Sequence, residues 1–276
     1  MPEPNVMACC SHRSAIVGSS DLIDDVLASD LVDDPSRSAA REPTAAVVTA
    51  RRRRRWAEQA SLAAVALGGI GAFLALSRAI GSEQGSAFDR AVVRKVGRVR
   101  GPMSNVIARA ITFFGAASGA VGISVTTTAA ALARKRPRLA SQIAVGALGG
   151  IAAELGFKRI FRRSRPTVLS HLEKVHSTSF PSGHSMAAAS LYLTLAFVAS
   201  RSPRLRARRS ALLIGGSGLA AMVGATRVYL GVHWPTDVLG GLALGTAWAS
   251  LTEAAFDLTG AERIEREAGA VPDLDW

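Results

Sequence analysis

The chain has 276 residues, of which 49% are hydrophobic and 5% aromatic, and its formal net charge at pH 7 is +12. The apolar residues gather into long runs bounded by basic clusters, which argues against the alternative of a soluble all-α protein with buried helices. The basic excess does not indicate nucleic acid, because no nucleic-acid motif accompanies it and the basic residues stand mainly at the ends of the runs. Anionic lipid headgroups are therefore the expected partner. Cys9 and Cys10 are adjacent, so no disulfide framework or CxxC metal site is available.

The N-terminal segment, residues 1–55, is predicted to be a disordered, basic-ended cytoplasmic tail. Its first fifty residues alternate small, polar and acidic residues, which is typical of disorder, although a partner-binding arm is the alternative. Residues 51–55 are five consecutive arginines directly before an apolar run, and the positive-inside rule assigns such a flank to the cytoplasm. A twin-arginine export signal is the weaker alternative, because the run is far from the start of the chain.

Six apolar runs follow, and each is close to the ~17–25 residues that a helix needs to cross a bilayer. They predict an all-α, polytopic membrane protein with six transmembrane helices in a domain of residues 56–256. Residues 257–276 are expected to form a polar cytoplasmic tail. The predicted helices lie at roughly residues 60–77, 110–133, 139–157, 183–200, 210–226 and 238–256.

The segment at residues 81–102 interleaves valine and phenylalanine with five basic residues, which predicts a short amphipathic helix on the membrane surface. With the N-terminus inside, this segment lies outside, and its basic residues count against that orientation. The basic loops at residues 134–138 and 201–209 then lie inside, as the positive-inside rule expects.

Three motifs stand at the ends of the apolar runs. K-x6-R-P begins at Lys158, P-S-G-H occupies residues 181–184, and [ST]-R-x5-H-x3-D occupies residues 226–237. Helices four and five run across the membrane and back, about 25 Å each way for seventeen residues, and so return His233 to the face of His184. The six-helix arrangement therefore predicts one active site, at the extracytoplasmic membrane surface.

The residue types in these motifs suit phosphoryl transfer, which needs cations around the phosphate, a nucleophile and a proton donor. Lys158, Arg165 and Arg227 supply the cations. Ser182 and Gly183 stand at a helix start, where free backbone N–H groups favour an anion.

Two histidines remain for the nucleophile and the acid. Asp237, four residues after His233, would accept a hydrogen bond from one ring nitrogen and leave the other free to attack. The protein's own cations make a metal unnecessary, and no cofactor is expected.

Together the three motifs resemble the signature of the phosphatidic acid phosphatase type 2 superfamily, whose relatives include vanadium haloperoxidases. The resemblance implies that His233 forms a phosphohistidine, and that His184 protonates the leaving group and later activates water. It also implies a membrane lipid substrate: polyprenyl diphosphate, phosphatidic acid or phosphatidylglycerol phosphate. A multi-pass protein of a bacterial plasma membrane is expected. A phosphotransferase using the same site, a soluble haloperoxidase and a noncatalytic membrane scaffold or transporter are the alternatives.

Glu154 stands one helical turn before Lys158 in an otherwise apolar run, and we predict that it holds the lysine toward the phosphate pocket. Other polar residues nearby are expected to be structural. Surface charges are predicted at Arg159, Arg162 and Arg163, and solvated loop residues at His171 and His176.

Overall fold

The computed structural model describes residues 45–80, 85–175 and 177–269. The greater part of the predicted N-terminal tail, residues 1–44, lies outside these ranges, as does His176. Helix α2 begins at Ala45, so the five-arginine run is helical and does not belong to a disordered tail. Arginine is a good helix former, and the run continues directly into the apolar part of the same helix.

The described chain is all-α, as predicted. Four segments are long and apolar enough to cross a membrane, at Arg52–Ala79, Pro102–Ala133, Pro137–Ile160 and Arg206–Tyr229, and Gly183–Ala199 is a shorter apolar helix. In order, the elements are α2 (Ala45–Ala79), α3 (Ala87–Gly97), α4 (Pro102–Phe113), α5 (Ala117–Ala133), α6 (Pro137–Ile143), the π-helical turn η2 (Ala144–Leu148), α7 (Gly149–Ile160), α8 (Gly183–Ala199), the 3-10 turn η3 (Arg206–Arg208), α9 (Arg209–Tyr229) and α10 (Pro235–Gly269).

Two further helix boundaries differ clearly from the sequence prediction. The second apolar segment begins at residue 102 instead of 110, because Pro102 suits the first position of a helix, and it is interrupted between α4 and α5. The last helix continues to Gly269, well into the segment predicted as a polar tail. Its Ala, Glu and Arg residues are strong helix formers, so the loss of apolar character at residue 257 does not end the helix.

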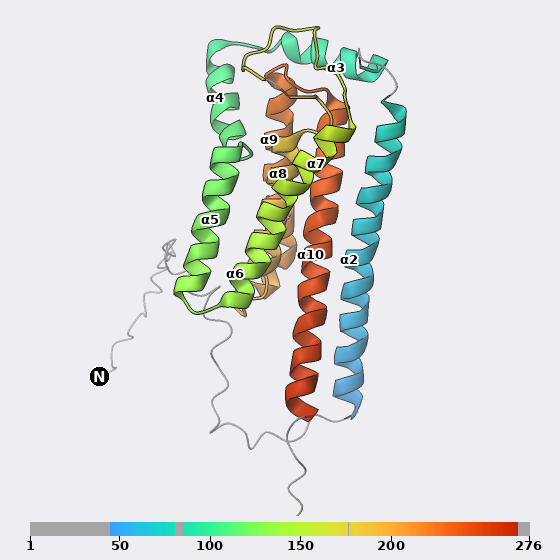
Figure 1. Cartoon of the computed structure of the whole chain (residues 1–276), viewed down its shortest axis with the longest axis vertical. Helices are drawn as coiled ribbons and strands as arrows, with labels where there is room; N and C mark the ends of the chain where they lie inside the picture. The colour runs from blue at the N-terminus through green and yellow to red at the C-terminus, as the bar shows by residue number, and fades with distance from the viewer. Residues whose placement is uncertain (1–44, 81–84, 176, 270–276) are drawn as a thin grey trace, which may run out of the picture.

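The motif-bearing helix ends lie together at one end of the bundle. Figure 1 shows α3 at that end, beside the long segment that joins α7 to α8. Helix α3 confirms the amphipathic helix predicted there, and it starts with a capping box in which Ser86 and Asp89 bond each other's backbone N–H groups.

Helices α8 and α10 pack closely below the site. A Cβ at Gly241 would lie 2.4 Å from the backbone oxygen of Ser182, so only glycine permits this approach. An aromatic cluster fixes the neighbouring segments: Phe73 of α2 stacks on Phe180 at 5.3 Å between ring centroids, and Phe161 meets Phe180 edge-on at 5.1 Å. Phe161 follows α7 and Phe180 precedes α8, so the cluster anchors the first two motifs to each other.

Candidate active site

Asp237 is fixed by the way that α10 begins. It is the third residue of the helix, where an acidic side chain is favoured by the free N–H groups and the helix dipole. Its Oδ2 accepts from the backbone N–H of Trp234 at 2.8 Å and from the Ser179 hydroxyl at 2.5 Å. The side chain is fully buried, so its charge is held in one place.

His233 lies between Asp237 and Arg165. Its Nδ1 is 3.5 Å from Asp237 Oδ2, so the carboxylate faces the ring nitrogen but is too far for the predicted hydrogen bond. Its Nε2 is 3.2 Å from Arg165 Nη1. Arginine can only donate, so Nε2 accepts and the ring proton belongs on Nδ1, toward the carboxylate. This tautomer leaves a lone pair on Nε2.

Burial governs the charge of this histidine. It lowers the pKa of His233 to about 4, although the negative charge of Asp237 acts in the opposite direction. His233 is therefore neutral at pH 7. Burial and the like charge of Arg227 similarly lower the pKa of Arg165 to about 10, which still leaves Arg165 charged at neutral pH.

Arg163, predicted to be a surface charge, is buried behind Asp237. One terminal nitrogen, Nη1, is 2.5 Å from Asp237 Oδ1, and the other, Nη2, is 2.8 Å from Asp89 Oδ2. The prediction was wrong because α7 ends at Ile160 and the chain then becomes extended. In an extended chain every second side chain points to the same side. Arg163 and Arg165 therefore both point into the protein, while Arg162 is exposed.

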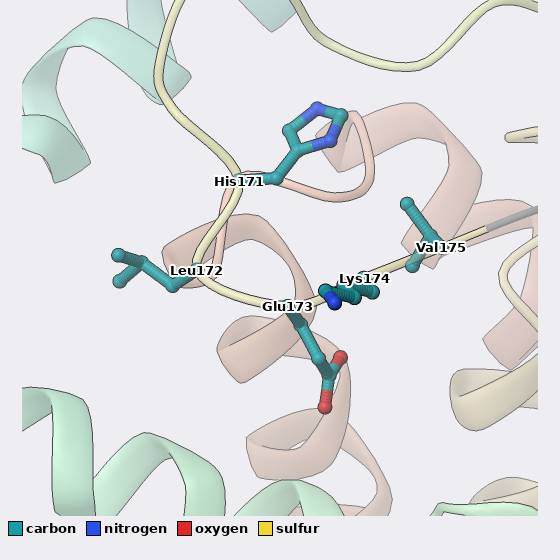
Figure 2. A pocket seen from close by; sticks show the side chains of 5 residues that line it. All are labelled: His171, Leu172, Glu173, Lys174 and Val175. Atoms are coloured by element: carbon teal, nitrogen blue, oxygen red, sulfur yellow. The ribbon is translucent and has the colours of Figure 1, made fainter.

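Arg227 is buried near the end of α9 and makes two contacts. Its Nη1 donates to the hydroxyl of Thr112 at 2.9 Å and lies 2.5 Å from Glu173 Oε2. Glu173 belongs to a short stretch that lines a cavity of about 390 Å³ (Figure 2), together with His171, Leu172, Lys174 and Val175. The sequence interpretation missed Glu173, because nothing in its local pattern marks it as the partner of a distant arginine.

Lys158 and Glu154 confirm the predicted pair. Lys158 Nζ lies 2.7 Å from Glu154 Oε1 and donates to the hydroxyl of Ser177 at 3.1 Å. The carboxylate also explains Gly183, since a Cβ at that position would stand 2.3 Å from Glu154 Oε1. A larger residue here would displace the Glu154 carboxylate from this position.

The P-S-G-H motif opens α8 as predicted. Ser182 is the N-cap residue of α8, and its backbone N–H donates to the Asp237 carbonyl at 3.0 Å, which ties the second motif to the third. Its hydroxyl is buried and accepts from Ser185 at 2.9 Å. His184 follows in the first turn of α8, near the Arg227, Lys158 and Arg165 cations and the His233 ring.

The structure thus gathers the predicted site residues at one end of the bundle, and adds contributors that the motifs do not specify. Among the residues that the structure describes, no group of three or more His, Cys, Asp and Glu side chains could hold a metal ion. His171 is exposed, as predicted, and a ring nitrogen lies 2.7 Å from the Pro166 carbonyl. The added residues around Asp237 and Arg227 are Asp89, Thr112, Arg163, Glu173, Ser179 and Thr236.

Residues 112–258 match the model of the PAP2 superfamily. The chain belongs to this superfamily. It is 34% identical over 176 residues to phosphatidylglycerophosphatase B of Bacillus subtilis, an alignment that covers 63% of this chain and 85% of that protein. It is also 35% identical over 102 residues to an undecaprenyl-diphosphatase of Sulfolobus acidocaldarius, which covers 37% of this chain and 44% of that one.

A solved structure extends the similarity to the fold. The crystal structure of the transmembrane PAP2 type phosphatidylglycerolphosphate phosphatase from Bacillus subtilis superposes with a TM-score of 0.64 at 31% identity, covering 70% of this chain and 96% of that one. The protein is therefore a multi-pass membrane PAP2 enzyme, a lipid phosphatase that hydrolyses phosphoric monoesters.

Proposed function

We propose that this PAP2 enzyme removes the terminal phosphate of phosphatidylglycerol phosphate or a related lipid phosphate through a phosphohistidine on His233. The observation that carries the proposal is the orientation of the His233 ring, with Nδ1 toward Asp237 and Nε2 toward Arg165. A lone pair on Nε2 beside a phosphate-binding cation is what an attack on phosphorus requires. Phosphatidylglycerol phosphate is the first choice because the relative that aligns over 85% of its own length carries that activity in its name.

The proposed reaction has two steps. His233 Nε2 attacks phosphorus, the bond from phosphorus to the lipid oxygen breaks, and protonated His184 gives its proton to that oxygen. Water then passes a proton to His184 and attacks the phosphohistidine, which releases phosphate and restores neutral His233. Lys158, Arg165 and Arg227 neutralise the phosphate oxygens throughout, while Ser182 and Gly183 offer the N-terminus of α8.

Proposed placement in the membrane follows from the same helices. We assign the fifth and sixth spans to α8 and α10, in addition to the four long apolar segments. At 1.5 Å per residue the 17 residues of α8 extend about 26 Å, close to the hydrocarbon thickness. The five arginines of α2 are placed in the cytoplasm of a bacterial cell, which puts the site on the extracytoplasmic side.

The test is phosphate release by the purified, detergent-solubilised chain from phosphatidylglycerol phosphate, phosphatidic acid and a polyprenyl diphosphate. His233→Ala, shown to be folded, is the control. We expect release from phosphatidylglycerol phosphate that disappears in the variant. Release from another lipid of the panel would move the assignment to that lipid. Release that persists in His233→Ala would refute the phosphohistidine, and loss of lipid phosphate only with an added acceptor alcohol would indicate a transferase.

A further inference from the structure

Asp89 is a buried carboxylate that the three motifs do not contain. It stands in α3, outside residues 112–258 that match the family model, and its side chain is completely buried. An isolated carboxylate at such a place would be costly, so its partners indicate why it is there. Those partners are Ser86, Arg163 and Thr236.

We propose that Asp89 is a positioning residue for the nucleophile: it holds Arg163, and Arg163 holds the carboxylate of Asp237 against His233. The proposal rests on the assignment of His233 as nucleophile made above. Asp89 touches neither the histidine nor any of the phosphate-binding cations through a hydrogen bond or ion pair that the structure contains. It therefore acts through the residues that it contacts, chiefly the guanidinium of Arg163.

The guanidinium forks between two carboxylates. Nη2 meets Asp89 at 2.8 Å and Nη1 meets Asp237 at 2.5 Å, so one positive charge is shared by two negative ones. Without the charge of Asp89, Arg163 would act fully on Asp237 and weaken its attraction for the His233 ring proton. Arg163 is further fixed by the Trp234 ring, whose centroid is 5.7 Å from its guanidinium carbon.

Asp89 also fixes the start of α10. Its Oδ1 accepts the backbone N–H of Thr236 at 3.0 Å, and the Thr236 hydroxyl lies 2.9 Å from its Oδ2. Thr236 directly precedes Asp237 in the first turn of the helix. The carboxylate of one helix therefore caps the N–H of another, which sets the position from which Asp237 projects.

A purely structural role is the competing explanation, in which Asp89 only keeps α3 folded and attached. Ser86→Ala separates the two explanations, because it removes the hydroxyl that accepts from the Asp89 backbone N–H and so weakens the start of α3. It leaves the Asp89 carboxylate and Arg163 in place. Asp89→Asn is the complementary change, since an amide keeps an oxygen for Thr236 and removes the charge facing Arg163.

The experiment compares purified wild type, Asp89→Asn, Ser86→Ala and His233→Ala on the lipid panel. In Asp89→Asn we expect kcat to fall on the order of 10- to 100-fold, as for a small misplacement of a reacting group, with KM changed less than about threefold. Ser86→Ala should lower the unfolding temperature and keep kcat within about twofold of wild type. Arg163→Lys, which cannot reach both carboxylates, should resemble Asp89→Asn.

A second measurement needs no turnover. Orthovanadate binds phosphoryl-transfer sites as an analogue of the transition state, and its binding can be followed by the rise in unfolding temperature that it produces. We expect Asp89→Asn to weaken vanadate binding about tenfold or more and Ser86→Ala to leave it unchanged.

The outcomes separate this inference from the proposed function. If wild type releases no phosphate from any lipid but Asp89→Asn still weakens vanadate binding, the substrate assignment fails and the positioning role stands. If Asp89→Asn matches wild type in kcat or in vanadate affinity, or if Ser86→Ala is as impaired as Asp89→Asn, the positioning role is wrong. Absence of vanadate binding to wild type would overturn it as well.

Discussion

Two ionic clusters, a buried one and a partly buried one, stand at the two ends of α8 and are built from the same kinds of side chain. At the site end Arg163 joins Asp89 and Asp237; at the other end Arg201 lies 3.1 Å from Glu253 and 2.7 Å from Asp257. The second cluster is closed by an amide, because Gln142 donates to Glu253 and accepts from Arg201. In the first cluster Asp237 instead faces the ring of His233.

The difference shows what turns a buried ion cluster into a candidate active site. A guanidinium between two carboxylates is a common way to satisfy buried charge, and by itself indicates only that helices are joined. At the site end the same arrangement stands next to His233, and Arg165 and Arg227 supply cations that the carboxylates do not fully neutralise. At the other end no histidine contacts the cluster among the residues that the structure describes.

The largest contrast is expected between Asp237→Asn and Glu253→Gln. Asp237→Asn should lower kcat by about 10³- to 10⁴-fold, because an amide no longer stabilises the proton on Nδ1 of His233. Glu253→Gln removes an equally buried carboxylate at the other end, and should lower the unfolding temperature while kcat stays within about threefold. Lipid phosphatase assays with thermal unfolding of both variants check this. Equal losses of activity would mean that the two clusters serve stability alone.

Glu154→Gln should produce a smaller loss, about tenfold in kcat/KM, since Lys158 would lose the carboxylate that aims it at the phosphate. The matched control is Glu58→Gln, which removes another i,i+4 ion pair, with Arg54, on an exposed part of α2. Exposed pairs of this kind contribute about 0.5 kcal/mol or less, so this control should be active. If Glu154→Gln were as active and as stable as wild type, the aiming role would be refuted.

Glu173→Gln is expected to act in the opposite direction. Its carboxylate pairs with Arg227, to which the proposed function assigns a phosphate oxygen. Removing the competing charge should therefore lower KM by about three- to fivefold. Asp257→Asn is the control, because Asp257 is exposed to a similar extent, 31% against 33%, and also pairs with an arginine. Steady-state kinetics on the same lipid check both. A raised KM in Glu173→Gln would show instead that Glu173 holds Arg227 in its binding position.

The smallest effect concerns pH. A histidine of ordinary pKa would lose roughly tenfold of its neutral form between pH 7 and pH 5.5. Because burial lowers the pKa of His233 to about 4, its neutral form persists over this range and its contribution to kcat should change less than about twofold. The same pKa shift affects the free energy of unfolding. His233 is protonated more readily in the unfolded chain than in the folded protein, so the folded protein loses stability as the pH drops from about 6.5 toward 4. The prediction would be contradicted by a kcat profile that falls on the acidic side with a midpoint near pH 6.5, if that fall is due to protonation of His233.

The position of the site was predictable because it depends on local rules. Apolar run lengths place helix ends, and motif spacing then brings His184, His233 and Lys158 to one end, as the structure has them. The pair of Glu154 with Lys158 follows from helical periodicity in the same way.

The supporting residues were not predictable in this way, because their partners are far away in the chain. Asp89 and Arg163 are 74 residues apart, and Arg227 and Thr112 are 115 apart. In the sequence Asp89 looks like any other charged residue of the predicted amphipathic helix, and nothing near it indicates that it is buried. For Arg163 a signal did exist: once the helix is known to end before residue 161, an extended R-x-R-P places both arginines on one side.

The π-helical turn η2, at Ala144–Leu148, lies between α6 and α7. It therefore precedes Glu154 and Lys158 in the same membrane span. A wide turn of this type accommodates one residue more than a regular α-helix, and each residue of an α-helix rotates the following face by about 100°. The facing direction of Glu154 and Lys158 is thus set by an insertion in the middle of the span. Shortening residues 144–148 by one would leave composition and hydropathy almost unchanged, yet it would turn the lysine out of the site and toward the lipid.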